Sequence, residues 1–163
     1  MFEQIIVALV AAGVRFVVVG GVAATIQGSA RLTNDIDICY DRAPDNVARL
    51  VALLTRWKAY LRGVERGLPF ILDERSFRTT PIMTLTTEAG DIDVLDVVPG
   101  VGDYAAALKA SEAVQIGSVE FRSLKLEALI ASKQAMRRPK DVEQLIELEA
   151  ILALRRQPKR AEA

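Results

Sequence analysis

Apolar and polar positions change period several times along this chain of 163 residues, and the changes predict its elements. Apolar residues in the range 2–12 recur with helical spacing and stop at Gly13, which predicts a short helix with a glycine at its C-terminal end. The β-branched and aromatic run 16–19 predicts a buried central strand. Residues 21–27 then predict a short helix, and residues 35–40 alternate polar and apolar side chains as a second strand does.

The rest of the chain predicts further helices and strands around one irregular region. Pro44 begins a helix that runs to about Trp57. Residues 58–81 contain several glycines and give a weak pattern, in which Phe70–Leu72 indicates a short strand. The remaining predicted elements are strands at 82–87 and 91–97 joined as a hairpin, a helix at 104–110, a hairpin of 113–116 with 119–122, a helix at 124–136 capped by Ser123, and a helix at 139–154. Together they predict one α/β domain over residues 1–163, with a core of about 1–122 and C-terminal helices at about 123–155.

Composition limits the chemistry that this domain can perform. Hydrophobic residues make up 51% of the chain, which suits one globular core, and 21 basic residues balance 21 acidic ones. The single cysteine, Cys39, excludes internal disulfides and fits a reducing cytoplasm, where we expect the protein to lie. The chain has no histidine, which excludes histidine general bases and imidazole metal sites. The apolar run at 5–12 is too short to span a bilayer, so no membrane association is expected.

Two acidic residues lie close together in the predicted strand at 35–40. Successive strand residues point to opposite faces, so Asp35 and Asp37 share one face and the isoleucines beside them take the other. Neighbouring carboxylates repel each other unless a cation or hydrogen-bond donors compensate their charge. Because aspartate is depleted in strands, the pair favours a divalent cation site over a solvated strand edge. Oxygen ligands favour Mg²⁺ or Mn²⁺.

A third carboxylate comes from the predicted strand at 91–97. Asp93 lies between two apolar residues, as Asp37 does, and Asp91 shares its face. If the two acidic strands are neighbours, Asp93 completes a cluster of three carboxylates, with Asp91 as the alternative. Asp96 points the other way and is expected to cap or pair. Such a cluster can hold two metal ions about 3.5–4 Å apart for an in-line displacement at phosphorus.

A glycine corner precedes the first acidic strand. Gly20 and Gly21 lie between the first predicted strand and the short helix, where free backbone N–H groups and the helix dipole attract an anion. The alternative is a tight turn that needs glycine for its backbone angles alone. In combination with the acidic cluster, the corner indicates phosphate binding and nucleotide chemistry.

Several short blocks of this sequence resemble the nucleotidyltransferase superfamily of the DNA polymerase β type. They are Gly20-Gly21, the segment Asp35-Ile-Asp-Ile after a gap of thirteen residues, the later Ile92-Asp-Val, and Leu129-Ile-Ala-Ser-Lys133 with Arg138-Pro-Lys140-Asp141. More narrowly, Arg31-Leu-Thr33-Asn-Asp35-Ile-Asp37 and the C-terminal block are similar to the AbiEii-like branch, known from toxin–antitoxin systems. The resemblance spans roughly residues 15–148. It implies a minimal nucleotidyltransferase fold, a short mixed β-sheet flanked by helices with a C-terminal helical extension.

The resemblance also implies a role for each candidate residue. Asp35 and Asp37 would hold the magnesium ions that bridge an NTP. Asp93 would share a metal ion and orient or deprotonate the attacking hydroxyl. The ammonium of Lys133 would approach the phosphates and counter the charge that builds on the leaving pyrophosphate.

The chain departs from the family pattern at two positions. Gly21 stands where many members carry a phosphate-binding serine, which leaves the backbone donors of Gly20 and Gly21 and, as an alternative, the hydroxyl of Ser29. In the tail, Gln144 replaces an acid that often follows the Lys-Asp pair by three residues. The departures bear on phosphate binding and on the tail helix, and they leave the predicted metal site unchanged.

The activity that the resemblance implies is transfer of a nucleoside monophosphate from an NTP to a hydroxyl, with Mg²⁺ or Mn²⁺ as cofactor. Implied acceptors are RNA, such as a tRNA end, or a protein, and a toxin role implies a cognate antitoxin protein as partner. The zero net charge argues against strong independent RNA binding. One alternative is a non-catalytic nucleotide-binding or regulatory module. Another is an antibiotic nucleotidyltransferase, for which Glu65, Asp73 and Glu74 are the nearby acids that would attract a cationic drug.

Overall fold

The computed structural model describes residues 2–158, so residues 1 and 159–163 of the predicted domain lie outside the description. The helices are α1 (Phe2–Ala11), α2 (Gly20–Ile26), α3 (Pro44–Arg56), α4 (Glu74–Thr79), α5 (Tyr104–Lys109), α6 (Leu126–Met136) and α7 (Pro139–Arg156). The strands are β1 (Phe16–Val19), β2 (Asp35–Tyr40), β3 (Tyr60–Leu61), β4 (Ile82–Thr87), β5 (Gly90–Leu95), β6 (Val97–Val98), β7 (Gly102–Asp103), β8 (Ser111–Ile116) and β9 (Val119–Leu124). Within this range, none of the helices is both long enough and apolar enough to cross a bilayer.

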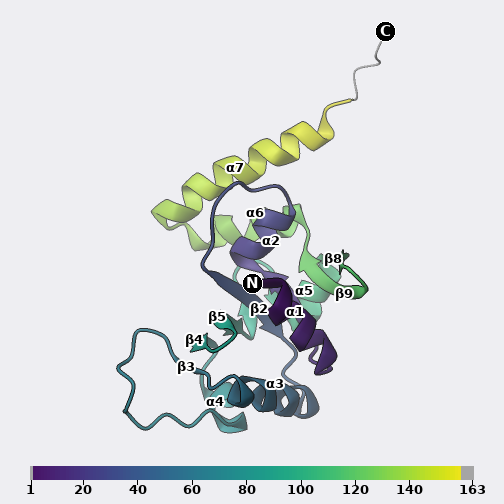
Figure 1. Ribbon diagram of the computed structural model, residues 1–163. Coiled ribbons are helices and arrows are strands. Elements are labelled where there is room, and N and C mark those ends of the chain that lie inside the picture. The colour runs from purple at the N-terminus through teal and green to yellow at the C-terminus, as the bar shows by residue number, and fades with distance from the viewer. Residues whose placement is uncertain (1, 159–163) are drawn as a thin grey trace.

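One mixed sheet organises the molecule (Figure 1). It has seven strands, in the order β3-β4-β5-β2-β1-β9-β8. Strand β2 pairs antiparallel with β1 and parallel with β5, and β1 pairs parallel with β9. Strands β6 and β7 form a separate two-stranded ribbon. A mixed sheet flanked by helices, with two helices at the C-terminal end, confirms the predicted fold class.

The apolar side chains of β2 and β5 fix which way the acidic side chains point. Ile36, Ile38 and Ile92 are fully buried on one face of the sheet. Burying a side chain of this kind contributes about 1.5–3 kcal/mol. A register slip of one residue would exchange these isoleucines for the aspartates, so hydrophobic burial holds the acids on the opposite face.

Helix α7 lies across the end of the molecule that is opposite α3 and α4 (Figure 1). Its Glu143 pairs with Arg31 at 2.7 Å, and its Glu147 accepts a hydrogen bond from the hydroxyl of Ser29. Near its other end, Arg155 donates to the main-chain carbonyl that follows α2 (2.7 Å). The contacts are spread along the helix, so α7 fixes the segment that leads from α2 into the acidic strand.

Three local predictions were wrong. Residues Phe70–Leu72 form no strand; they belong to a loop that ends at α4, where the carboxylate of Asp73 accepts the backbone N–H of Ser76 (2.9 Å) and caps the helix. The capping box overrides the strand preference of the three apolar residues. Ser123 is a buried residue of β9 and does not cap α6, whose N-cap is Lys125. The predicted strand at 91–97 also ends earlier, at Leu95.

Candidate functional site

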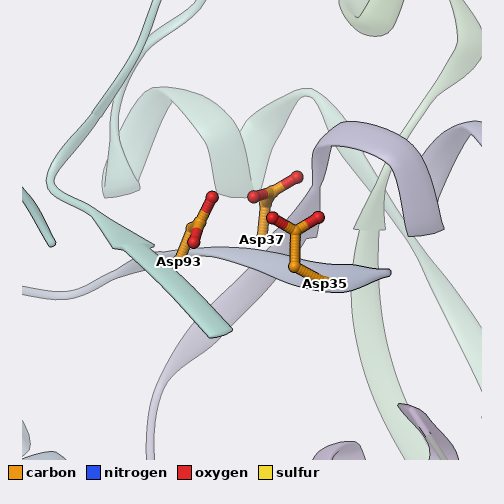
Figure 2. A group of neighbouring side chains, drawn as sticks. All are labelled: Asp35, Asp37 and Asp93. Carbon is orange, nitrogen blue, oxygen red and sulfur yellow. The ribbon is translucent and has the colours of Figure 1, made fainter. Parts of the chain in front are cut away.

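Asp35, Asp37 and Asp93 gather on one face of the sheet (Figure 2). The first two come from β2 and the third from β5, and the parallel register of these strands places Asp37 directly beside Asp93. One carboxylate oxygen of each residue lies within 4.8 Å of the others. We refer to these three residues as the triad. A donor set made of carboxylate oxygens alone fits Mg²⁺ or Mn²⁺ and does not fit metals that prefer nitrogen or sulfur.

Burial and mutual repulsion perturb the titration of the triad. The pKa of Asp37 is raised to about 8, first because the group is buried and then because of its hydrogen bond with Asp93 and the charges of Asp93 and Asp35. The pKa of Asp93 is also raised, chiefly by burial. Without a metal ion, the Asp37–Asp93 pair therefore retains a proton at neutral pH.

The glycine corner is packed tightly against the triad. Gly20 has a φ of +62°, and a Cβ atom placed on it would lie 2.0 Å from Asp37 Oδ2. A Cβ atom on Gly21 would lie 2.9 Å from Thr33 Oγ1, and that hydroxyl donates to the main-chain carbonyl of Asp35 (3.0 Å). Both glycines are therefore required for packing around the acidic strand, in addition to any contact with a phosphate.

A pocket of about 470 Å³ opens in front of the triad. The triad and the two corner glycines line it on the sheet side. Its other polar lining includes four cationic side chains and the amide of Gln144; the cations are Arg31, Lys133, Arg138 and Lys140. Within residues 2–158, no carboxylate outside the triad lines the pocket. The pocket thus combines a cation-binding surface with an anion-binding one.

A fully buried aspartate holds two of these cations in place. Asp141 accepts hydrogen bonds from Lys133 Nζ (3.1 Å), from the backbone N–H of Arg138 (3.1 Å) and from Arg138 Nε (2.6 Å). Burial acts to raise the pKa of Asp141, but the hydrogen bonds from Arg138 and Lys133 outweigh it and lower the pKa to about 2. Asp141 is therefore ionised at neutral pH, and it anchors Lys133 and Arg138 at the start of α7.

Other predicted residues lie apart from the triad. Ser29 is buried and does not line the pocket, because its hydroxyl is directed to Glu147 of α7. The alternative third acid, Asp91, lies on β5 beside the triad but outside the group that could share a metal ion. Asp96 pairs with Arg42 at 3.4 Å, as expected for the residue that points the other way.

The sequence pattern did not single out Arg62, which forms ion pairs with Asp35 (3.1 Å) and Asp93 (2.8 Å). This arginine follows the short strand β3, in the region of weakest pattern. The predicted acidic cluster was the available signal for such an arginine, because three neighbouring carboxylates repel each other and are stabilised by a cationic side chain from elsewhere in the chain.

Comparison with known proteins identifies the fold. The solution structure of the antibiotic-resistance factor ANT(2″)-Ia matches 95% of this chain and 89% of its own length, at 14% identity and a TM-score of 0.57. The crystal structure of ANT(2″)-Ia with adenylyl-2″-tobramycin matches 94% and 93%, at 17% identity and a TM-score of 0.54. A Thermotoga maritima protein assigned as a nucleotidyltransferase matches 94% and 91%, at 18% identity and a TM-score of 0.51.

The chain has the nucleotidyltransferase fold. This confirms the expected fold. No protein-family model and no curated protein matches the sequence. Because identities below a fifth establish the fold alone, the activity and the acceptor have to be argued from the site.

Proposed function

We propose that this protein transfers a nucleoside monophosphate from an NTP to a hydroxyl acceptor at the triad. The observation that carries the proposal is the pocket itself, in which three carboxylates and four cationic side chains line one cavity. Carboxylates that repel each other and cations that approach them are stabilised together when a metal–triphosphate complex binds between them.

Asp35, Asp37 and Asp93 would hold the divalent cations. Bound there, Mg²⁺ or Mn²⁺ supplies stabilisation of the negative charge that develops on the phosphate oxygens. Asp93 would orient the acceptor hydroxyl or accept its proton as a general base. The acceptor oxygen bonds to the α-phosphorus, the bond from that phosphorus to its bridging oxygen breaks, and pyrophosphate leaves.

The cationic side of the pocket would bind the phosphates. Lys133 has little freedom to move, since its side chain is only 11% exposed and bonded to Asp141. Arg138 is half exposed and shares the same aspartate. Prepositioned cations stabilise the pyrophosphate charge without reorganisation during the reaction. Gly20 and Gly21 would contribute backbone N–H groups from the start of α2.

Within residues 2–158, no carboxylate outside the triad lines the pocket and could attract a cationic antibiotic, so the proposed acceptor is neutral or anionic, such as a protein hydroxyl or RNA. Glu65, Asp73 and Glu74, the acids that would attract a cationic drug, are exposed and do not line the pocket. Asp73 is instead used to cap α4. A toxin role with a cognate antitoxin rests on the motif resemblance to the AbiEii-like branch.

Labelled substrates test the proposal directly. The protein is incubated with each α-labelled NTP, Mg²⁺ or Mn²⁺, and one of three acceptors: total cellular RNA, a cell lysate or an aminoglycoside. We expect label to enter one acceptor class with one preferred nucleotide, and the Asp35→Asn variant to transfer none. A wild-type protein that is inert with every RNA, protein and aminoglycoside acceptor would favour the non-catalytic nucleotide-binding module.

A further inference from the structure

Arg62 joins the two strands that carry the triad. Its Nη1 donates to Asp35 Oδ2 on β2 (3.1 Å), and its Nη2 donates to Asp93 Oδ1 on β5 (2.8 Å). The same Nη2 donates to the main-chain carbonyl of Leu85 on β4 (2.8 Å), and its backbone N–H bonds to the carbonyl of Thr84 (3.0 Å). The guanidinium is therefore held against the face of the sheet by main-chain and carboxylate acceptors.

The surroundings of Arg62 are strongly acidic. Its Nε lies 3.4 Å from Asp91 Oδ2, an ion pair without a hydrogen bond, so the side chain meets a third carboxylate. The side chain is 28% exposed, which makes the charge interactions stronger than those at an open surface. Burial acts against the charged form, but Asp93, Asp91 and Asp35 together raise the pKa of Arg62. Arg62 thus neutralises much of the charge of the triad.

The guanidinium uses oxygens that a metal ion would also need. At Asp35, Arg62 engages Oδ2, and the hydroxyl of Thr33, whose closer acceptor is the main-chain carbonyl of Asp35, lies 3.3 Å from Oδ1. Asp93 has Oδ1 engaged by Arg62. Within the described residues, no ion pair joins Arg62 to Asp37, the innermost acid. A divalent cation that binds the triad would therefore share the carboxylates of Asp35 and Asp93 with the Arg62 guanidinium.

We infer that Arg62 is an exchangeable counter-ion of the triad, which holds Asp35 and Asp93 in position and leaves their oxygens when a divalent cation binds. The inference deepens the proposed function, on which its biological meaning rests. It makes Arg62 a positioning residue that lowers metal affinity and stabilises the metal-free site. Its removal should therefore strengthen metal binding, whereas loss of a purely structural contact should weaken it.

The test is a calorimetric titration of the full chain with Mn²⁺ after chelator treatment. Arg62→Gln keeps hydrogen-bonding capacity and removes the charge, and we expect it to bind Mn²⁺ about tenfold more tightly than the wild type. In EDTA the same variant should melt at a lower temperature, because three carboxylates then lose their cation. Arg66→Gln is the matched control: it removes an exposed arginine of the same loop that takes part in no ion pair of the described chain, and it should behave as the wild type.

Unchanged or weaker Mn²⁺ binding by Arg62→Gln would overturn the inference. If that variant does not fold in EDTA, Arg62→Lys replaces it, because an ammonium keeps the charge but lacks the fork that spans both carboxylates. We expect Arg62→Lys to bind Mn²⁺ about threefold more tightly, and equal or weaker binding again overturns the inference. If neither the wild type nor Arg62→Gln binds Mn²⁺, the exchange is also overturned.

The outcome is separable from that of the proposed function. A protein that transfers no nucleotide but shows these shifts in Mn²⁺ affinity would support Arg62 as a counter-ion and count against the enzyme. A protein that transfers nucleotide but shows no such shifts in Mn²⁺ affinity would support the proposed function and count against Arg62 as an exchangeable counter-ion.

Discussion

The substitution Asp37→Asn should make the metal-free protein more stable at neutral pH while it removes metal binding. Asp37 is the innermost acid of the triad, and its pKa is raised from 3.8 to about 8, chiefly by burial and then by Asp93 and Asp35. Asparagine is nearly isosteric with the protonated acid, and its amide can donate to Asp93 as the carboxyl proton does. The variant should therefore preserve the fold.

The sign of the effect follows from proton linkage. Above pH 3.8 the unfolded chain releases the proton of Asp37, whereas the folded chain keeps it until about pH 8. The folded state therefore binds more protons, and the free energy of unfolding falls as the pH rises through this window. The maximum slope for one proton is about 1.4 kcal/mol per pH unit. The chain has no histidine, so few other groups titrate in the same range.

Asp37→Asn should raise the free energy of unfolding by less than the whole pKa shift of Asp37 would give. If the whole shift acted on stability, the gain at pH 8 would be about 5 kcal/mol. Because solvent still reaches part of the triad and Arg62 lies close by, we expect about 2 kcal/mol. The assay is urea unfolding in EDTA at several pH values between 5.5 and 8. The wild type should lose stability as the pH rises, and Asp37→Asn should lose less.

A matched control is Asp91→Asn, which removes an acid from the same sheet face outside the group that could share a metal ion. It should leave the slope with pH unchanged. Equal slopes for the wild type and Asp37→Asn, or a variant less stable than the wild type at pH 8, would refute the reasoning. Calorimetry with Mn²⁺ should show no binding to Asp37→Asn, and wild-type affinity should rise with pH up to about 8, since the metal needs the ionised acid.

Three further substitutions test other parts of the site. Asp93→Asn should leave NTP affinity within about tenfold but lower the single-turnover transfer rate at least about a hundredfold, and transfer at the wild-type rate would move the base to another residue. Gly20→Ala places a Cβ atom 2.0 Å from Asp37 Oδ2 and should weaken Mn²⁺ binding by at least about tenfold, measured by calorimetry. Its control is Gly117→Ala, at a φ of +59° with no atom near the new Cβ, which should cost about 1–2 kcal/mol in stability and leave Mn²⁺ affinity unchanged. Asp141→Asn leaves two cations without their carboxylate, so it should lower the free energy of unfolding by about 3 kcal/mol, measured by urea titration. It should also raise the KM for NTP. A loss of stability below about 1 kcal/mol would contradict the anchoring role of Asp141.

The local pattern of the sequence determined the elements around the site and the direction of the acidic side chains. Alternation in a strand places Asp35 and Asp37 on one face because neighbouring isoleucines must be buried on the other. The sequence also predicted that the first helix ends at a glycine. Gly13 has a φ of +72°, and the backbone N–H of Val14 donates to the carbonyl of Leu9 (3.1 Å), as in a glycine-terminated helix. These features depend on a few consecutive residues, so a short window of sequence contains their cause.

Only the tertiary structure decided which groups meet. The parallel register of β2 with β5 selects Asp93 over Asp91 as the neighbour of Asp37, and sheet pairing is a long-range choice that two strand patterns leave open. Arg62 reaches Asp35 across 27 positions of sequence, from a segment without a clear pattern. The buried Asp141 accepts hydrogen bonds from both Lys133 and Arg138 because α6 and α7 pack against each other. An ion pair depends on the distance between charges in space, and that distance is set by the packing of the whole sheet and its helices rather than by the spacing of the residues along the chain.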